Sequence, residues 1–232
     1  NNLLFRGYDA LESLEAYAKD VETRASTRVI VSSPDKLASA TIRNFEVTGE
    51  MLGNYVAPVS CDVSSGNSCK MHFTPIPLVR RVQVTLNVRG LNNVRKVRCT
   101  LNDVPLSVFL HNGHAGEELG SQEFTVGSPV YEEGSFTEGK LTGMFDVFSL
   151  DRLMSHSMTL KALLVDGKTV VEQVLTDVIV KEKIDDVGSI TFYIDAPIPE
   201  TIPDVKPEGS ADSGFDVDVD DWKEDEEIDI PI

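Results

Sequence analysis

The feature that most constrains the fold of this 232-residue chain is a strict alternation of apolar and polar residues. It is strongest in residues 81–89, where the apolar positions are Val82, Val84, Leu86 and Val88. Successive side chains of a strand point to opposite faces, so this segment predicts a strand with one buried and one solvated face. The same period recurs in residues 97–101, 190–194 and 215–220. The chain is therefore predicted to be all-β.

Two further apolar runs, residues 159–165 and 168–174, are joined by Asp166 and Gly167. Asp-Gly is the dipeptide typical of a type I′ turn, because both central residues of that turn need a positive φ. These residues predict a β-hairpin closed by a type I′ turn. Shorter strands are expected at residues 27–31 and 41–47.

One segment has the pattern of a short helix. Leu11, Leu14 and Ala18 lie at helical spacing, Asp9 precedes them as a candidate N-cap, and Glu12 follows three residues later as in a capping box. A helix is therefore expected over residues 9–19.

Proline divides the chain. Pro75 and Pro77 come just before the strongest strand, and four further prolines occupy residues 196–209. Because proline lacks the backbone donor that a central strand needs, both stretches are predicted to be connectors or edge segments. We expect a domain boundary near residue 74, with residues 1–74 as the remainder of an N-terminal domain and residues 75–232 as a C-terminal domain.

Charge excludes one class of function. Lys and Arg number 21 against 38 Asp and Glu, a formal net charge of −17, so the chain lacks the basic surface of a nucleic-acid or anionic-membrane binder. Residues 210–232 hold ten acidic residues and one lysine, a net of −9. The longest stretch free of charged residues, 104–116, is 13 residues long and falls short of the ~20 that a transmembrane helix needs.

The three cysteines support neither a disulfide framework nor a Cys-x-x-Cys metal or redox site. Cys61 and Cys69 bracket a turn-rich loop, which could close as a disulfide in an exported protein or hold two reduced thiols. Cys99 alternates with Val97 and Leu101, which favours a buried, inert thiol.

Candidate metal sites are weak. His111 and His114, followed by Glu117 and Glu118, could hold a metal ion, but a solvated loop between strands is the favoured interpretation. Asp216, Asp218, Asp220 and Glu227 match positions 1, 3, 5 and 12 of a calcium loop. Position 6, where that loop needs glycine, is Asp221, so a solvated acidic strand face is favoured instead.

Catalytic motifs are missing from the sequence. It has no Gly-x-Ser-x-Gly nucleophile elbow, no P-loop and no Gly-x-Gly-x-x-Gly motif. We therefore expect no enzymatic activity and no cofactor. One basic cluster is expected on two neighbouring strands and could dock an acidic partner or be an ordinary solvated face; its members are Arg80, Arg81, Arg89, Arg95, Lys96 and Arg98.

The C-terminal run from Ser213 to Trp222 resembles the closing strand of the fimbrillin-like lipoproteins of Bacteroidales, the FimB/Mfa-like families and related lipoproteins of unknown function. Other stretches follow in the same order as in those families. They are the opening Asn1-Asn2, residues 22–25, 33–37, 88–91 and 163–167, and residues 175–178. These motifs mark strands and turns and do not mark a site.

The resemblance implies two transthyretin-like β-sandwich domains and a place on the cell surface, lipid-anchored in the outer membrane or within a fimbrium. Such proteins carry a lipidated cysteine and further strands ahead of the Asn-Asn segment. We therefore expect the N-terminal domain to be incomplete in these 232 residues, with membrane contact only through an anchor outside them.

Two functions are weighed. The first is a fimbrial subunit, anchor or adhesin-like protein that assembles with other surface subunits through a strand or a surface. Phe215, Val217 and Val219 would be the inward anchors of an assembly strand, closed by Trp222. The alternative is a surface glycan-binding lipoprotein, for which Tyr131, Phe136 or Trp222 would form an aromatic platform.

Overall fold

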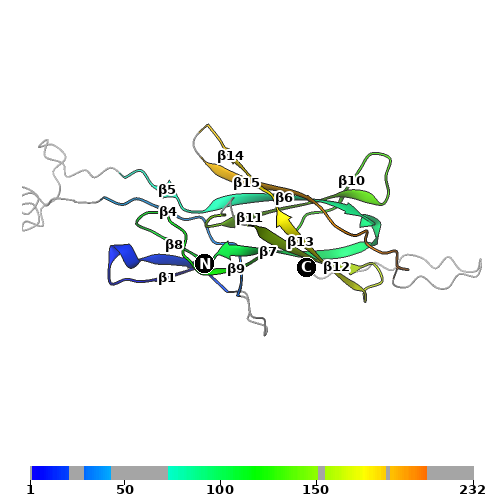
Figure 1. The fold of residues 1–232 in the computed structure, drawn as a ribbon, viewed down its shortest axis with the longest axis horizontal. Coiled ribbons are helices and arrows are strands. Elements are labelled where there is room, and N and C mark those ends of the chain that lie inside the picture. Colours follow the sequence, from blue (N-terminus) through cyan, green and yellow to red (C-terminus); the bar gives the residue numbers. More distant parts are fainter. Residues whose placement is uncertain (1, 21–28, 43–72, 151–154, 187–188, 208–232) are drawn as a thin grey trace, which may run out of the picture.

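The fold is a two-layer β-sandwich, seen here in a computed structural model that describes residues 2–20, 29–42, 73–150, 155–186 and 189–207. Two five-stranded sheets pack face to face, and two smaller sheets lie at one end (Figure 1). The prediction of an all-β sandwich is confirmed. None of the described segments forms a helix long and apolar enough to cross a membrane.

The first sheet has the strand order β10-β11-β6-β15-β14. Its strands are β6 (Arg80–Arg89), β10 (Val130–Tyr131), β11 (Glu138–Val147), β14 (Val180–Ile184) and β15 (Ile190–Pro197). The central strand β6 is the strongly alternating segment, which pairs antiparallel with β11 and parallel with β15. All four of its predicted apolar positions are buried.

The second sheet has the order β13-β12-β7-β9-β3. Its strands are β3 (Ile30–Val31), β7 (Val94–Pro105), β9 (Leu119–Phe124), β12 (His156–Leu164) and β13 (Val170–Val178). The main core fills the space between the two sheets and includes Leu86, Leu101, Leu160 and Ile194. Large aliphatic side chains from facing strands thus exclude water from the centre of the sandwich.

The hairpin predicted over residues 159–174 is confirmed as β12 and β13, but the type I′ turn is wrong. Gly167 has a φ of +69°, whereas Asp166 is not among the non-glycine residues with positive φ. The loop is longer than two residues, because the Leu164 N–H bonds to the Thr169 carbonyl. The Asp166 carboxylate accepts the N–H groups of Lys168 and Thr169 at 3.0 and 2.9 Å, which holds Asp166 in a different turn.

The helix expected over residues 9–19 is also wrong. A single 3-10 turn, η1 (Leu11–Ser13), is followed by the strand β2 (Glu15–Ala18). The capping box does not form, because the N-cap is Ala10, whose side chain makes no capping hydrogen bond. Strand β2 pairs on both sides, with β1 (Leu3–Arg6) and β8 (Ser107–Phe109), so tertiary pairing overrides the local helical pattern.

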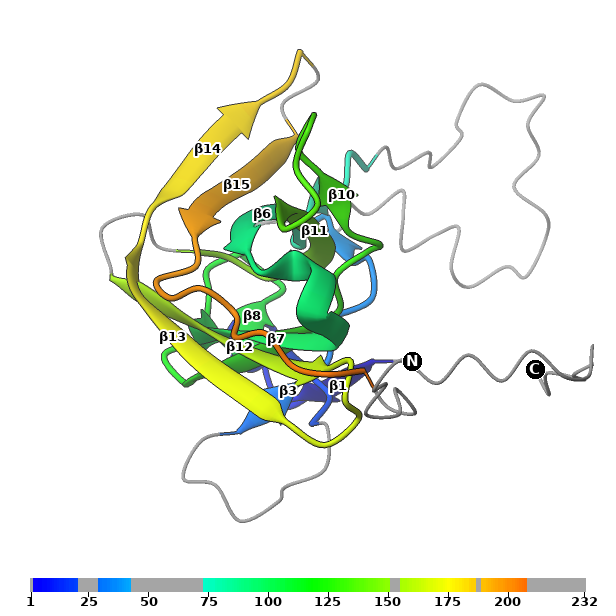
Figure 2. The ribbon, with the colours of Figure 1, turned by 90° about the vertical axis from the view of Figure 1, so that its right-hand side faces the viewer.

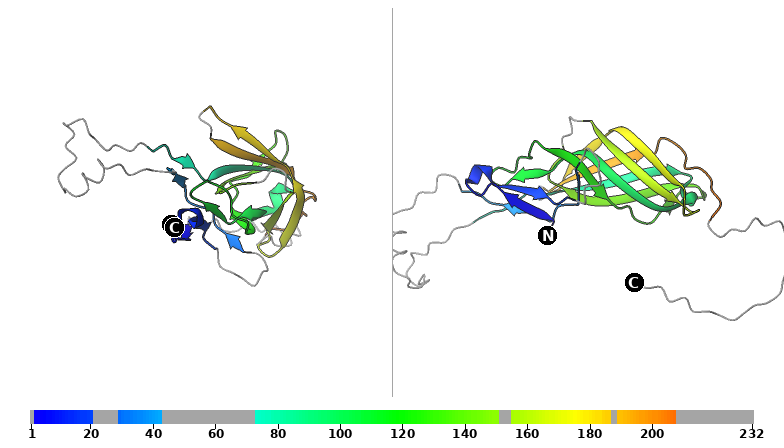
Figure 3. Two further views of the ribbon diagram at one scale, coloured as in Figure 1. Left: turned by 60° about the vertical axis from the view of Figure 1, so that its left-hand side comes forward. Right: turned by 90° about the horizontal axis from the view of Figure 1, so that it is seen from below.

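The three-stranded sheet β1-β2-β8 extends beyond one end of the sandwich (Figure 3). Its alanines Ala16 and Ala18 pack with Val31, Val108 and other residues in a second, smaller hydrophobic cluster. The two-stranded sheet of β4 (Ala38–Ser39) and β5 (Ile76–Pro77) lies at the same end. The predicted edge role of Pro77 is therefore confirmed.

Strands on either side of the expected boundary near residue 74 hydrogen bond with each other. β2 pairs with β8, and β3 pairs parallel with β9. The two-domain division remains a prediction.

The proline-rich segment after β15 is packed against the sandwich. We call residues 198–206 the C-terminal clasp. Ile198 and Ile202 are buried in the main core, and their N–H groups donate to the carbonyls of Asn87 and Arg89, each at 2.9 Å. Gly90, with a φ of +79°, allows this approach, because a Cβ there would lie 2.2 Å from the Ile202 carbonyl oxygen.

The clasp also reaches the second sheet. Gln173 of β13 is buried, and its amide donates to the Glu200 carbonyl at 3.0 Å while accepting the Glu200 N–H at 3.1 Å. The clasp therefore joins β6 of one sheet to β13 of the other, on the side where β13 leads into β14 (Figure 2). Proline suits this segment because its ring fixes φ, and because the segment is not a strand of either sheet and needs few backbone N–H donors.

Candidate functional site

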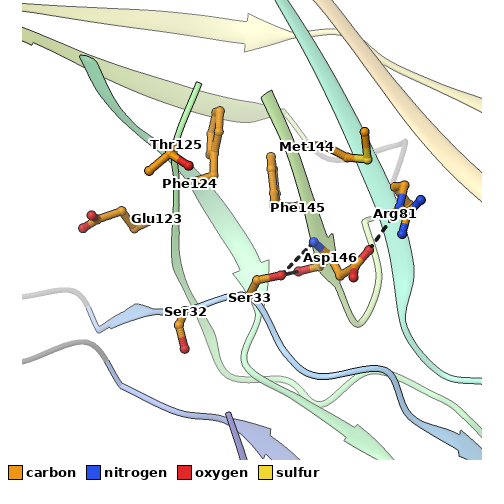
Figure 4. Close-up of a pocket in the computed structure, with 9 residues that line it drawn as sticks. All are labelled: Ser32, Ser33, Arg81, Glu123, Phe124, Thr125, Met144, Phe145 and Asp146. Atoms are coloured by element: carbon orange, nitrogen blue, oxygen red, sulfur yellow. Dashed lines mark hydrogen bonds and ion pairs between the residues drawn. The ribbon is translucent and has the colours of Figure 1, made fainter. Parts of the chain in front are cut away.

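A cavity of about 410 Å³ lies on the opposite side of the sandwich, where β9 and β11 diverge (Figure 4). We call it the seam pocket. The two strands meet at a bridge between Val126 and Gly143 and separate beyond it. One wall of the seam pocket is the stacked pair Phe124 and Phe145, whose ring centroids lie 4.4 Å apart.

Ser33 closes the far end of the seam pocket. Its hydroxyl accepts the Asp146 N–H at 2.8 Å and donates to the Asp146 carbonyl at 3.1 Å. The Asp146 carboxylate pairs with the Arg81 guanidinium at 3.5 Å. The residues that line the seam pocket include no histidine or cysteine. The Ser33 hydroxyl already hydrogen bonds to the Asp146 main chain. The seam pocket offers polar binding groups beside an aromatic wall.

A second hollow lies across the Arg81–Asp146 pair from the seam pocket and has a volume of about 500 Å³. We call it the end groove. Its lining combines polar and charged residues with the apolar residues Leu37, Ala38, Val79 and Ile190. Its cations are Arg81, which pairs with Asp146, and Lys36.

Two of the predicted aromatic residues come together at the other end of the sandwich. Tyr131 ends β10, and Phe136 lies in the turn between β10 and β11. Their side chains are 44% and 87% exposed, which makes Phe136 the most exposed large hydrophobic side chain of the described residues. We call residues 130–138 the aromatic knob.

The histidine pair lies on a loop between β8 and β9, as predicted. The ring of His111 packs edge-on against Phe109 with centroids 6.0 Å apart, and its Nδ1 is buried without a hydrogen-bond partner among the described residues. His114 lies beside the Asn112 amide. Within the described part of the chain, no group of three His, Cys, Asp or Glu is arranged to hold a metal ion.

The prediction that the six basic residues lie together on two neighbouring strands is wrong. β6 carries Arg80, Arg81 and Arg89 in the first sheet, and β7 carries the other three residues in the second sheet. The turn η3 (Leu91–Asn93) connects β6 of the first sheet to β7 of the second sheet. Leu91 of this turn is buried in the core between the two sheets. Arg98 pairs with Glu123 at 3.4 Å.

Cys99 is a free, fully buried thiol, as predicted, and burial raises its pKa to about 12. Cys61 and Cys69 lie outside the described residues. The assembly residues Phe215, Val217, Val219 and Trp222 and the acidic positions near them also lie outside these residues.

Sequence reasoning missed the seam pocket, the end groove and the clasp. The clasp had a signal, because Ile198 and Ile202 lie four residues apart among the prolines. The seam pocket and the end groove had no signal in the sequence, since each is lined by segments that are far apart in the chain.

Comparison of this chain with known proteins identifies a family to which its sequence matches and a solved structure with a similar fold. Residues 1–125 match the domain of unknown function DUF5119. A solved structure described as "a putative adhesin from Bacteroides ovatus ATCC 8483" has a similar fold, with a TM-score of 0.53 at 17% sequence identity. The match covers 76% of this chain and 61% of that protein's length. No curated protein matches the sequence.

Proposed function

This chain belongs to the DUF5119 family, and we propose that it is a cell-surface structural protein: a fimbrial subunit, an anchor or an adhesin-like protein that assembles with other surface subunits. The observation that carries the proposal is the shared fold with the Bacteroides ovatus protein described as an adhesin. In this proposal the protein is not an enzyme and does not bind nucleic acid. It meets the outer membrane only through an N-terminal lipid anchor.

The sandwich is suited to assembly because one edge of its second sheet is a long strand. Strand β13 is nine residues long and lies at the edge of the second sheet, and β14 lies at the edge of the first. Edge strands expose backbone N–H and carbonyl groups that can pair with another chain. Apolar side chains such as Val174 and Ile179 are exposed along this edge.

The proposal is tested on cells that produce the full precursor. Surface labelling and protease treatment of intact cells should reach the protein, and high-molecular-weight assemblies should be recovered from the surface fraction. A chain lacking residues 214–232 should lose assembly. A protein found only in the cytoplasm, or one whose assembly and melting are unchanged by the deletion, would contradict the proposal.

One observation favours the alternative of glycan binding. Tyr131 and Phe136 lie within six residues of one another on the aromatic knob, and carboxylates of the same knob could accept sugar hydroxyls. Affinity electrophoresis through polysaccharide gels separates the two functions. Retardation of the native protein that is lost in Phe136→Ala would favour the glycan-binding alternative.

A further inference from the structure

The aromatic knob is held in one backbone conformation. The Ser135 N–H bonds to the Glu132 carbonyl at 3.0 Å, and the Ser135 hydroxyl accepts the N–H of Glu138 at 2.9 Å. The Glu132 N–H bonds to the Glu138 carbonyl at 3.0 Å. The Thr137 carbonyl accepts the Leu91 N–H at 2.8 Å, which ties the knob to the core. A loop fixed in this way loses little conformational freedom when it binds a partner.

The knob has the chemistry of an interface anchor. A rigid, exposed phenylalanine gains most when it enters an apolar pocket of a partner. Around it, Glu132, Glu133 and Glu138 are its charged residues, so its rim is acidic. The matching surface is an apolar hollow with a cation at the edge.

The end groove of this chain has that chemistry. Five of its eleven lining residues are apolar, and its volume of about 500 Å³ is in the range of pockets that hold a group larger than one side chain. The carboxylates at its edge are engaged, since Asp146 pairs with Arg81 and Asp185 accepts the Ser189 N–H at 2.7 Å. Lys36 also lines the groove, and it forms no ion pair among the described residues.

The knob and the end groove lie at opposite ends of the same strand. β11 begins at Glu138, beside the knob, and reaches Asp146 at the end groove eight residues later, about 26 Å away at ~3.3 Å per residue. Figure 1 shows β10 and the β4–β5 pair at opposite ends of the long axis. A knob therefore cannot reach the groove of its own chain.

We propose that the aromatic knob of one copy docks into the end groove of the next copy, with Phe136 against the apolar lining residues and the knob glutamates beside Lys36. The two surfaces differ, so the contact is head-to-tail and leaves a free knob and a free groove at the ends of every oligomer. Contacts of this kind produce rings or open filaments. The inference rests on the proposed function, because it names the surface through which copies assemble.

The test uses two variants of the full 232-residue chain, each blocking one side of the contact. Phe136→Ser removes the anchor, and Ala38→Trp fills the groove from an exposed position of β4. The matched control is Tyr8→Ser, which removes an aromatic side chain that is 75% exposed elsewhere. Sedimentation velocity over a concentration series measures association, and thermal melting checks that each variant is folded.

The native chain and Tyr8→Ser should self-associate. Each blocking variant should self-associate with an affinity at least about 30-fold lower. An equimolar mixture of the two blocking variants should form a 1:1 dimer and nothing larger, because one supplies a groove and the other a knob. Association of the native chain should weaken with added salt.

Three results would overturn the inference. The first is a native chain that stays monomeric up to about 1 mM. The second is self-association of Phe136→Ser equal to that of the native chain, which would leave surface assembly standing through another contact. The third is unchanged sedimentation with loss of polysaccharide binding in Phe136→Ser, which would assign the knob to glycans. Failure of the proposed function is separate, since it would appear as a protein that is absent from the cell surface.

Discussion

The sandwich has two seams, one on each side, and they are closed by different means. On the β13 side, the clasp fills the seam with two buried isoleucines and joins the sheets through the Gln173 amide. On the β9 side, the strands meet at one bridge, and the seam pocket is closed at its far end by the Ser33 hydroxyl. Both seams bury apolar side chains, since Phe124 and Phe145 are 4% and 5% exposed on the β9 side. The β9 side differs because it also holds a pocket of about 410 Å³, whose far end is closed by polar contacts of Ser33.

This difference predicts where the sandwich opens first. Burial of large aliphatic side chains contributes more free energy of unfolding than a partly solvated hydrogen bond does. The clasp side should therefore open only with global unfolding, whereas the Ser33 end of the β9 side should open locally. Three variants test this contrast, and a fourth probes a turn outside both seams; they follow in order of decreasing effect.

The largest effect is expected from Ile202→Ala in the clasp. The side chain is almost fully buried in the main core, so its loss should lower the free energy of unfolding by about 2–5 kcal/mol. Urea denaturation measures the change, and the exposed Ile179→Ala is the matched control, expected within about 0.5 kcal/mol of the native chain. Equal stability of Ile202→Ala and the control would mean that the clasp does not hold this seam.

A smaller effect is expected from Gln173→Ala. This change leaves the N–H and carbonyl of Glu200 without their partner, which should cost about 1–3 kcal/mol. Hydrogen exchange of the Glu200 amide should accelerate at the same time. Thr176→Ala, at an exposed position of the same strand, serves as the control. An unchanged Glu200 exchange rate in Gln173→Ala would show that other contacts hold the clasp.

Ser33→Ala should act on the other seam and remain local. Loss of the hydroxyl removes two hydrogen bonds to the Asp146 main chain, at a cost of about 1 kcal/mol. Exchange of the Asp146 amide should accelerate, while the Cys99 thiol should remain unreactive toward a thiol reagent until global unfolding, because it is fully buried. Thiol reactivity in folded Ser33→Ala would place the opening in the main core and contradict the contrast. Ser32→Ala, whose single bond to the Lys19 carbonyl is longer at 3.3 Å, is the control.

The smallest effect is expected at the β12–β13 turn, which belongs to neither seam. Hydrogen bonds from Thr169 and Lys168 lower the pKa of Asp166 below its ordinary value of about 3.9. A lowered pKa in the folded state stabilises the fold above the unfolded-state pKa, and that contribution is lost as the pH falls through the folded-state pKa. The difference in melting temperature between the native chain and Asp166→Ala should therefore shrink below about pH 4. A difference in melting temperature that stays constant from pH 3 to 6 would contradict a stabilising role of the Asp166 carboxylate.

Local patterns predicted the strands well and the connections between them less well. The alternation of residues 81–89 determines which face of β6 is buried, so it could be recognised directly. Residues 9–19 have a helical spacing, but residues 15–18 among them form β2, because partners on β1 and β8, the latter about 90 residues away, supply its hydrogen bonds. The basic residues of β6 and β7 could be found from the sequence, but their division between two sheets depends on the burial of Leu91. Both hollows also arise from long-range packing and have no local signal.

The clasp also determines how the molecule would carry a mechanical load. A pulling force applied to the chain beyond Pro207 reaches β15 only through residues 198–206, since these are the residues between them. The main-chain bonds of Ile198 and Ile202 to β6, and the bond of Asn93 to Asp204 at 2.7 Å, must therefore yield before β15 is peeled from the sheet. Tension from the acidic C-terminal segment is thus borne first by a seam that is fastened to both sheets.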